Sequence, residues 1–390
     1  MALQAKILLM DHFSTKRSIM IIAGETSGDL HGAKLVSAMQ KKNNKLFFCG
    51  IGGRALKETG VNILIDASEI SVVGITEVFS KTPGILRGLR MVKKMLKTAP
   101  PDLLILIDFP DFNLHVASTA KKLRIPILYY ISPQIWAWRS GRVKKIGKLV
   151  DHMAVILPFE EKFYKERGIP VTFVGHPIME NNLLSEEVLL EKWLEDTPVI
   201  GLLPGSRHGE IARHLPIMLE AARILFQKIK PIKFAISLAP DVEEKYIKDI
   251  VKKFNRTDAF EIITDNVEKI FEKSRIVVAA SGTVTLEAAI SGTPMVIIYK
   301  VSPVSYFLGK NLIQVKHIGL VNLVAGKEIV PELIQQAASP GGIADLVIKM
   351  LSNPSGLKAL GMELLSIRNK LGEAGASERV SDIAFSMLAR

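Results

Sequence analysis

The sequence predicts an α/β protein built from two doubly wound parallel sheets. Apolar runs of strand length alternate with helical segments along the chain, and the runs are continuous, as in parallel strands covered on both faces. Turns of small residues join strand to helix in both halves, which is typical of βαβ units. The pattern breaks at Gly175-His176-Pro177 and resumes near residue 199, so we expect one domain on either side of this break.

The stretch from Arg275 to Tyr299 is the clearest of these units. It predicts a strand over 276–280, a Ser281-Gly282-Thr283 turn, a helix over 284–290 and a second strand over 295–299. Such a turn leaves backbone N–H groups at the positive end of a helix, where a phosphate binds well. Glu287 lies one helical turn further on and could accept two hydrogen bonds from a ribose diol. An ordinary capped helix with a solvated glutamate fits these residues equally well.

The other predicted elements follow the same alternation. In the first half we expect strands at 18–23, 46–49, 103–107, 125–131, 153–157 and 171–174, and helices at 30–40, 83–97, 112–123 and 159–167. In the second half we expect strands at 199–203, 234–238 and 260–263, and helices at 210–229 and 242–254. After residue 299 we expect a helix over 304–315, a loop over 319–326 and three short helices from 331, with an amphipathic last one over 376–390.

Length and composition agree with this division. A chain of 390 residues with 48% apolar residues is long enough for two cores. We place an N-terminal domain at 1–180, a C-terminal domain at 181–374 and a C-terminal helix at 375–390. The single cysteine, Cys49, excludes an internal disulfide and favours a reducing compartment. Neither a membrane-spanning apolar run nor a signal peptide is predicted, so we expect a cytoplasmic protein.

The net charge of +12 is concentrated in the first half. Residues 1–180 hold 26 of the 51 Lys and Arg but only 15 of the 39 Asp and Glu, which leaves 25 against 24 for the remainder. A basic half-molecule favours an anionic partner, such as nucleic acid, an acidic membrane face or a phosphorylated substrate. A basic surface that serves only solubility is also consistent with this pattern.

Residues 72–97 are the part of the chain most suited to a lipid surface. The helix predicted from Pro83 has an apolar stripe and an opposite face of Arg and Lys without acids. Most of that stripe is expected to pack on the sheet. The better candidates for membrane contact lie just upstream of this helix, at Val72, Val73, Ile75, Val78 and Phe79.

Two acids follow the apolar strand predicted at 103–107. In open α/β sheets chemistry collects at the carboxyl ends of strands, which is where Asp108 and Asp111 stand. One could act as a general base while the other caps the following helix. Further on, Trp136 and Trp138 lie among cations, where they could stack on sugars or bases, touch lipid, or pack in the core.

Two further turns offer donors to anions. Glu25 to Asp29, with Thr26, Ser27 and Gly28 between them, follow the first strand, although their spacing matches neither GxGxxG nor a P-loop. In the second half Pro204-Gly205-Ser206-Arg207 follows the strand at 199–203, and the fork of Arg207 could clamp a diphosphate. A surface arginine that caps the end of the preceding strand is the alternative interpretation of Arg207.

The sequence holds no motif for a metal or cofactor. It lacks a Cys/His cluster, HExxH, GxSxG and an Asp-x-Asp pair, so we expect no metal and no cofactor. A diphosphate leaving group would then be stabilised by Arg207 and helix N-termini.

Taken together, these motifs resemble those of the lipid-A-disaccharide synthases, GT-B-type glycosyltransferases of lipopolysaccharide biosynthesis. The matching stretches occur in order and span residues 19–390: GETSGD (24–29), VVGITEV (72–78), DFPDFN (108–113), SPQIWAWR (132–139), GRVKKI (141–146), LPFE (157–160), GHP (175–177), LLPGSR (202–207), SGTVTLEAA (281–289) and NLVAG (322–326). Phe109 stands where alanine is common in the family.

The resemblance implies two Rossmann-like domains facing a cleft, with the C-terminal helix crossing back to the first. It further implies transfer of 2,3-diacylglucosamine from UDP-2,3-diacylglucosamine to the 6-hydroxyl of 2,3-diacylglucosamine 1-phosphate. The product would be a β-1,6-linked disaccharide 1-phosphate with release of UDP, at the cytoplasmic face of the inner membrane.

The same resemblance assigns roles to residues of this chain. Asp108 is the expected base and Asp111 the second choice, because an inverting transfer needs only one base. The Glu25–Asp29 turn would line the acceptor side. On the donor side, the expected diphosphate ligands are Gly205, Ser206, Arg207, Ser281, Gly282 and Thr283, with Glu287 on the ribose and Asn322 near the donor.

Other interpretations stay open at this point. One is a different UDP-sugar enzyme, such as a 2-epimerase or a GT-B transferase with another lipid-linked acceptor. A second is a basic nucleic-acid-binding protein, although the basic residues form no RRM, KH or helix-turn-helix pattern. The sequence also leaves open whether the chain forms a homodimer.

Overall fold

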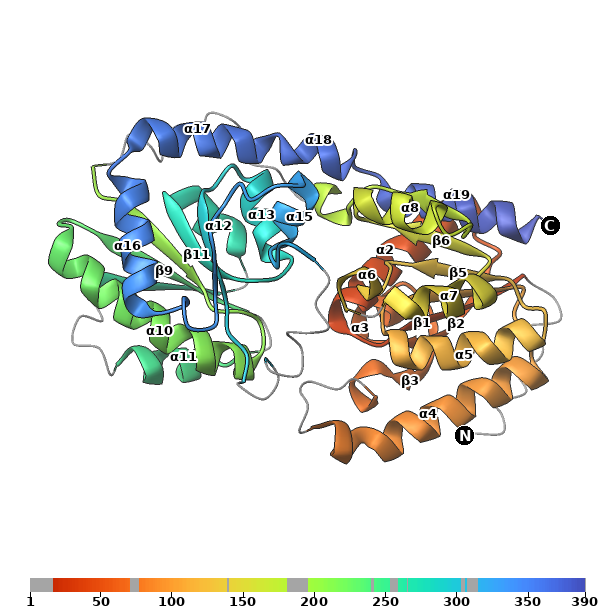
Figure 1. Ribbon diagram of the computed structural model, residues 1–390. Coiled ribbons are helices and arrows are strands. Elements are labelled where there is room, and N and C mark those ends of the chain that lie inside the picture. The colour runs from red at the N-terminus through yellow and green to blue at the C-terminus, as the bar shows by residue number, and fades with distance from the viewer. Residues whose placement is uncertain are drawn as a thin grey trace. The chain divides into compact units, whose positions relative to one another are not determined.

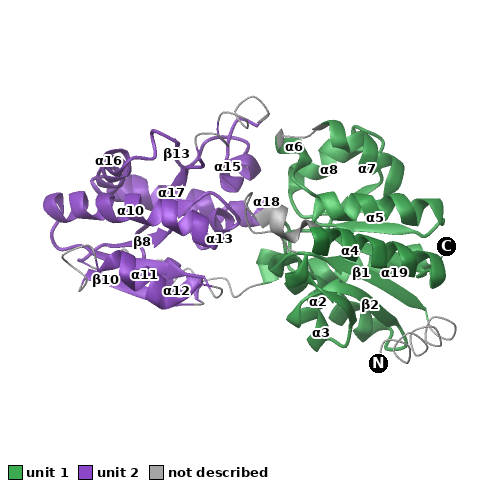
Figure 2. Cartoon of the chain, turned by 90° about the horizontal axis from the view of Figure 1, so that it is seen from below, with its two compact units in different colours: residues 1–180, 372–390 green, residues 181–371 purple. Residues whose placement is uncertain are grey.

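The chain folds into two α/β units, each built on one parallel sheet. The computed structural model describes residues 17–70, 77–138, 140–180, 196–239, 242–252, 259–264, 266–302, 306 and 315–389, and not the side chains of 77–82, 138 and 140. Unit 1 comprises Met1–Glu180 and Gly372–Arg390, and unit 2 comprises Asn181–Leu371 (Figure 2).

Unit 1 holds a seven-stranded sheet in the order β3-β2-β1-β4-β5-β6-β7, with parallel pairs throughout. Its strands are β1 (Ser18–Ala23), β2 (Phe47–Gly52), β3 (Asn62–Asp66), β4 (Leu103–Ile107), β5 (Ile127–Tyr130), β6 (His152–Val155) and β7 (Val171–Phe173). Alternate residues of the inner strands feed two separate apolar cores: Met20 and Ile22 enter one, while Ile19 and Ile21 enter the other. Burial on both faces is why these strands read as unbroken apolar runs.

Helices cover both faces of this sheet (Figure 1). They are α2 (Thr26–Lys42), α3 (Arg54–Glu58), η1 (Ala67–Glu69), α4 (Glu77–Thr98), α5 (Pro110–Lys122), α6 (Ile135–Trp138), η2 (Ser140–Arg142), α7 (Val143–Leu149), α8 (Pro158–Lys165), η3 (Pro177–Glu180) and the C-terminal α19 (Ala376–Leu388). Val92 and Leu96 of α4 are buried in the core, so the helix packs its stripe on the sheet as expected.

The C-terminal helix α19 belongs to unit 1. Its Val380, Ala384 and Met387 lie in the same core as α2 and β1. Polar contacts hold it as well, since Arg379 Nε donates to the Val174 carbonyl at 2.8 Å. The chain rejoins unit 1 at Gly372, three residues before the boundary expected from the sequence.

Unit 2 holds a six-stranded parallel sheet in the order β10-β9-β8-β11-β12-β13. The strands are β8 (Val199–Leu203), β9 (Lys233–Leu238), β10 (Phe260–Thr264), β11 (Ile276–Ala280), β12 (Met295–Tyr299) and β13 (Glu332–Ile334). The helices are α10 (His208–Lys228), α11 (Glu244–Val251), α12 (Val267–Lys273), α13 (Val284–Ile290), α15 (Leu320–Ala325), α16 (Pro340–Leu351), α17 (Pro354–Leu365) and α18 (Ile367–Leu371).

Several sequence expectations differ from these elements. The expected loop over 319–326 contains the helix α15, and the expected all-helical tail begins with the edge strand β13. Both elements are short, so the hydrophobic periodicity that distinguishes a helix or strand from a loop spans too few residues to be recognised. Helix α2 starts four residues before the expected residue 30, because Thr26, Ser27 and Gly28 form its first turn. The helix expected over 304–315 lies outside the described residues except for 306 and 315.

Both sheets change their direction of winding at one point. In unit 1 the chain runs from β1 outward to β3 and then returns to place β4 beside β1. In unit 2 it runs from β8 to β10 and returns to place β11 beside β8. In such sheets the crevice outside the carboxyl ends of these two central strands is where ligands bind.

Candidate active site

The switch point of unit 1 brings the first two predicted turns together. Ala23, the last residue of β1, pairs with Ile107, the last residue of β4, so Gly24 and Asp108 leave the sheet side by side. A Cβ atom on Gly24 would lie 2.3 Å from the ring of Phe109, so only glycine fits there. The turn that follows β1 and the turn that holds Asp108 and Phe109 are therefore in direct contact.

Asp108 stands on an unusual backbone. Its φ is 44° and that of Phe109 is 47°, two consecutive non-glycine residues in the left-handed region. The Asp108 carbonyl oxygen accepts hydrogen bonds from Asn113 Nδ2 at 2.7 Å and from the Tyr129 hydroxyl at 2.6 Å. The residue itself is only partly buried.

Asp111 is the more exposed of the two acids. Its side chain is 73% exposed, and one oxygen lies 2.6 Å from Nη2 of Arg142. Asp111 therefore lies on the exposed surface of α5 beside Arg142, whereas Asp108 is partly buried at the end of β4.

The Glu25–Asp29 turn divides into two parts. Glu25 occupies the N-cap position of α2, and Thr26 and Ser27 are exposed in its first turn. Asp29 is buried instead, and its carboxylate accepts from the backbone N–H groups of Gly53 at 2.6 Å and Ala55 at 2.9 Å. These bonds stabilise the start of α3, so Asp29 holds the fold beside the site, a role different from the acceptor contact expected of it.

Trp136 does not form a stacking platform. It is 8% exposed, donates from Nε1 to Glu160 Oε1 at 2.9 Å and packs edge-to-face on Phe159. Glu160 is 1% exposed, and burial raises its pKa from 4.5 to about 7. The Trp136–Glu160 pair anchors the loop after β5, which corrects the sugar, lipid and base interpretations of Trp136. The side chain of Trp138 lies outside the described residues.

The switch point of unit 2 joins the two turns predicted for the diphosphate. Leu203 of β8 pairs with Ala279 of β11, so Pro204–Arg207 and Ser281–Thr283 leave one edge of the sheet from neighbouring strands. Gly205 has a φ of 115°, and a Cβ on it would lie 2.5 Å from Glu210 Oε2. Glycine is thus required for the close approach of this turn to Glu210.

Glu210 already binds two of the predicted phosphate donors. Its Oε2 accepts from the Ser206 N–H at 3.1 Å, and its Oε1 lies 3.6 Å from Nη1 of Arg207. The Arg207 side chain is 55% exposed and can reach a ligand. Sequence reasoning missed Glu210, although its place on the first turn of the helix after Arg207 could have indicated it.

His214 is a second residue that the sequence reasoning missed. It is buried, with Nδ1 2.9 Å from the Pro204 carbonyl oxygen and Nε2 3.2 Å from the Lys300 carbonyl oxygen. Burial lowers its pKa. His214 therefore ties the Pro204 turn to the end of β12.

The Ser281–Thr283 turn is partly committed to the fold. Ser281 donates its N–H to the Ile298 carbonyl at 3.0 Å and its hydroxyl to the Ile318 carbonyl at 3.1 Å. A Cβ added to Gly282 would meet nothing within 4 Å, and Thr283 is exposed. The space beside Gly282 and Thr283 is open to a ligand.

Glu287 is a partly buried carboxyl on α13, one turn from Thr283. Desolvation, with a smaller effect from the charge of Glu268, raises its pKa from 4.5 to about 7. Such a shift is common in binding sites.

Asn322 is placed differently from the expectation. It is fully buried on α15, where Oδ1 accepts from the N–H groups of Ile329 and Val330 and Nδ2 donates to Glu332 Oε1. Its side-chain amide thus holds the loop before β13, and its oxygen and nitrogen both bond to the protein. The contact of Asn322 with the donor stays a prediction.

The predicted membrane residues fall at the edge of the described structure. Val72 and Val73 lie outside the described residues, while Val78 and Phe79 belong to α4 with undescribed side chains. On the described part of α4, Leu86 is 46% and Met91 41% exposed. In the described part of the chain, no helix is both long and apolar enough to cross a membrane.

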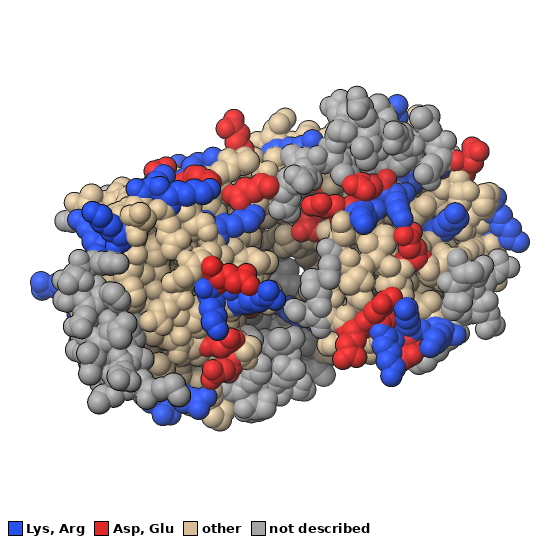
Figure 3. Space-filling view, turned by 180° about the vertical axis from the view of Figure 1, so that it is seen from behind, with Lys and Arg blue, Asp and Glu red and all other residues tan. Residues whose placement is uncertain are grey.

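Charge on the described surface is mixed. On the face shown in Figure 3, Lys and Arg side chains alternate with Asp and Glu side chains and do not merge into one basic patch. Among the described residues, no three His, Cys, Asp or Glu side chains gather to hold a metal ion.

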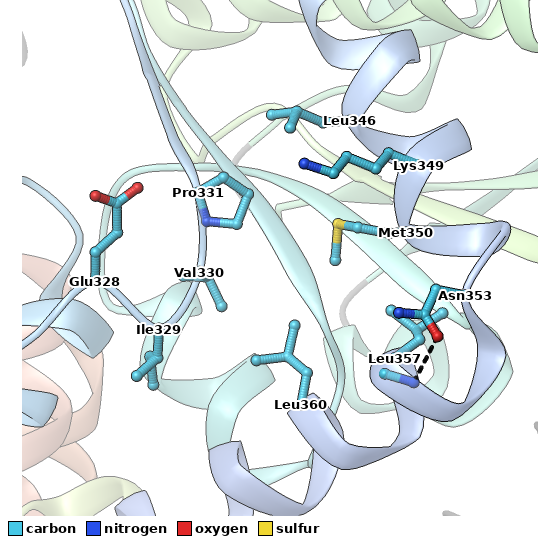
Figure 4. A pocket seen from close by; sticks show the side chains of 11 residues that line it. Glu328, Ile329, Val330, Pro331, Leu346, Lys349, Met350, Asn353, Leu357 and Leu360 are labelled. Carbon is cyan, nitrogen blue, oxygen red and sulfur yellow. Dashed lines mark hydrogen bonds between the residues drawn. The ribbon is translucent and has the colours of Figure 1, made fainter.

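One cavity lies away from these turns. It has a volume of about 510 Å³ in unit 2, and its wall includes Val330, Lys349, Met350 and Leu357 (Figure 4). Because Glu328 to Pro331 precede β13, this cavity lies at the amino edge of that strand, opposite the edge where Ser281 leaves the sheet.

Similarity to solved structures defines the class of fold. A UDP-GlcNAc 2-epimerase from Neisseria meningitidis bound to UDP-GlcNAc matches with a TM-score of 0.60 at 13% identity, over 95% of this chain and 99% of that chain. A glycosyltransferase from Rickettsia africae matches with a TM-score of 0.57 at 12% identity, over 96% and 99%. With two parallel sheets and its turns at their switch points, the protein has the fold of GT-B glycosyltransferases and UDP-sugar 2-epimerases.

Sequence similarity defines the family within that class. The family model for lipid-A-disaccharide synthetase matches residues 19–378. Lipid-A-disaccharide synthases from Syntrophus aciditrophicus and Geobacter sulfurreducens are 48% and 45% identical, over 95% and 97% of this chain and 97% and 99% of theirs. The synthase from Coxiella burnetii is 39% identical over 96% of this chain and 99% of its own. The chain belongs to the lipid-A-disaccharide synthase family and is a glycosyltransferase.

Proposed function

We propose that this glycosyltransferase moves 2,3-diacylglucosamine from its UDP conjugate to the 6-hydroxyl of 2,3-diacylglucosamine 1-phosphate. The products are the β-1,6-linked disaccharide 1-phosphate and UDP. Family membership over residues 19–378 carries this proposal, and the two sets of turns at the switch points support it. The epimerase and nucleic-acid alternatives lose their support, because the relatives of 48% and 39% identity described above are both lipid-A-disaccharide synthases.

The chemistry divides between the two units. Asp108 accepts the proton of the acceptor hydroxyl as that oxygen attacks the anomeric carbon of the donor. Its place directly after β4, at the switch point of the sheet, and its partial exposure support this choice. Inversion at the anomeric carbon follows from a single displacement with one base.

Unit 2 supplies the stabilisation of the leaving group. As the bond to the donor sugar breaks, negative charge develops on the UDP diphosphate. Arg207 and the N–H groups of Ser206, Gly282 and Thr283 offer donors at one edge of the sheet, where they balance that charge. Glu287 binds the ribose diol from the helix that follows.

Unit 1 binds the acceptor phosphate and contacts the lipid surface in this proposal. We assign the exposed first turn of α2, at Thr26 and Ser27, to the phosphate or sugar of the acceptor. The charge excess of residues 1–180 favours an anionic inner-membrane surface, approached from the cytoplasmic side. A homodimer is a separate hypothesis that sedimentation equilibrium decides.

The direct test is a two-substrate assay. The purified chain is incubated with UDP-2,3-diacylglucosamine and 2,3-diacylglucosamine 1-phosphate, and disaccharide and UDP are measured together. Equimolar formation of both is expected. UDP release without disaccharide, or no reaction at all, would reject the proposed transfer.

The membrane proposal has its own test. Replacing Val72, Val73 and Phe79 by serine is expected to reduce sedimentation with anionic vesicles, because apolar contact adds to charge attraction. Leu123→Ser serves as the control, since Leu123 is a 38% exposed leucine elsewhere in unit 1. Equal sedimentation of both variants would place lipid contact elsewhere.

A further inference from the structure

We infer that Asn113 and Tyr129 are positioning residues that hold the backbone of Asp108 in the conformation its function requires. This inference rests on the proposed role of Asp108 as the base. Neither residue reaches the substrate in this scheme. Each acts through the carbonyl group of Asp108.

The backbone at Asp108 needs outside support. A residue other than glycine in the left-handed region costs about 1–2 kcal/mol, and here two such residues follow one another, at Asp108 and Phe109. Strand β4 ends at Ile107 and helix α5 begins at Pro110, so only these two residues make the bend. The same bend determines where the Asp108 side chain leaves the chain.

Asn113 and Tyr129 fix the carbonyl in the middle of this bend. Asn113 Nδ2 donates to the Asp108 carbonyl at 2.7 Å and also lies 3.2 Å from the Ile107 carbonyl oxygen. The Tyr129 hydroxyl donates to the Asp108 carbonyl at 2.6 Å. A carbonyl oxygen has two lone pairs, so these two donors saturate it and set its direction.

The two donors come from different elements and are both inaccessible to solvent. Asn113 lies on α5 and Tyr129 on β5, and each is 0% exposed. Burial, aided by the nearby charge of Asp108, raises the pKa of Tyr129, so its hydroxyl remains a donor at neutral pH. The bend is hydrogen-bonded to both a helix and a neighbouring strand. Moving only one of these elements therefore does not release the backbone of Asp108.

The free-energy cost of burying the Asn113 amide supports a positioning role for this residue. Its Oδ1 is buried with no hydrogen-bond partner among the described residues. Leaving such an acceptor unpaired costs roughly 1–3 kcal/mol, which an apolar side chain of similar shape would avoid. A gain in stability does not explain why an amide stands at this position. Its hydrogen bonds to the carbonyl groups of Ile107 and Asp108, which orient them, explain it better.

The neighbouring residue supplies a matched control. Tyr130 is also 0% exposed and lies on the same strand, but its side chain enters the opposite core and its hydroxyl has no partner among the described residues. Tyr129→Phe and Tyr130→Phe thus remove the same buried atom. Only the first change touches Asp108.

The experiment compares these variants in steady-state kinetics and thermal unfolding. Tyr129→Phe is expected to lower kcat by about 10- to 100-fold, because misplacing a base weakens proton transfer. The donor KM and the unfolding temperature should stay close to those of Tyr130→Phe. Asn113→Ala tests the second donor and should lower kcat likewise.

A double-variant comparison separates positioning from general damage. In an Asp108→Ala background, Tyr129→Phe should leave the residual turnover unchanged, since the group it positions is absent. A further loss in that background, or equal kcat for Tyr129→Phe and Tyr130→Phe, would overturn the inference. If Asp108→Ala itself retained full turnover, the proposed base would fail instead, so the two failures are distinguishable.

Discussion

The two units use the same topological position in different ways. In unit 1 the turn after β4 is bent into a strained conformation and gripped by buried donors, and it presents one carboxylate. In unit 2 the turns after β8 and β11 present several backbone and guanidinium donors, with Arg207 more than half exposed. A base must sit at one distance from one hydroxyl, whereas a diphosphate offers many oxygens to many donors. Strain is therefore expected where a single atom must be placed.

The largest effect is expected from Asp108, the proposed base in unit 1. Asp108→Ala should lower kcat by about 10³-fold or more, while UDP binding by unit 2 persists. Asp111→Ala should cost less than about tenfold, because its exposed ion pair with Arg142 adds little. Turnover assays with parallel UDP calorimetry check both variants. The reverse ranking would move the base to Asp111.

Loss of one donor in unit 2 should cost less. Arg207→Ala is expected to lower kcat/KM by about 10²-fold and to weaken UDP binding, because other donors remain at the same edge. Arg223→Ala is the matched control, since Arg223 is 61% exposed and paired with Glu220 on the same helix. Comparable losses for both arginines would argue against a diphosphate role for Arg207.

Glu287 should link donor binding to pH. Its raised pKa of about 7 means that the carboxyl carries a proton below that pH and accepts two ribose hydrogen bonds only above it. The donor KM is therefore expected to rise by up to about tenfold from pH 8 to pH 6. Glu287→Gln should have a high donor KM that no longer varies over this range. A variant that keeps the wild-type pH profile would exclude Glu287 as its cause.

The smallest effect on activity is expected from changes at the Trp136–Glu160 pair. These changes should alter the stability of the fold instead. Because the pKa of Glu160 is raised from 4.5 to about 7 by folding, the native state holds this proton more tightly, and stability falls as pH rises through that range. The loss is about 1–3 kcal/mol and is complete above pH 7. Glu160→Gln should remove this fall, as judged by the difference in unfolding temperature from wild type between pH 5 and 8. An unchanged difference across this range would contradict it.

The strand framework was predictable to the residue in its central parts. The expected strands over 18–23, 103–107, 199–203 and 276–280 coincide with β1, β4, β8 and β11. Burial on both faces demands unbroken apolar runs, and such runs have sharp ends. These ends are where both sets of turns begin, so the places of the candidate sites followed from the sequence.

The partners of polar side chains were less predictable. Asp29 and Asn322 stand in motifs that suggest ligands, yet both saturate backbone groups of segments 24 and 8 residues away along the chain. Nothing local distinguishes an aspartate that caps a distant helix from one that binds a sugar. Likewise, the left-handed backbone at Asp108 comes from tertiary contacts that no propensity reveals.

Glu210 gives the proposed donor site an anion of its own. Its carboxylate contacts the Ser206 N–H and Arg207, which are among the groups assigned to the diphosphate. In the proposed reaction, entry of UDP-sugar exchanges one anion for another, and departure of UDP reverses the exchange. The Arg207 guanidinium and the Ser206 N–H then keep an anionic partner between turnovers. Competition from Glu210 is expected to lower the affinity for nucleotide. It thereby speeds the release of UDP, the product that retains most of the donor's contacts.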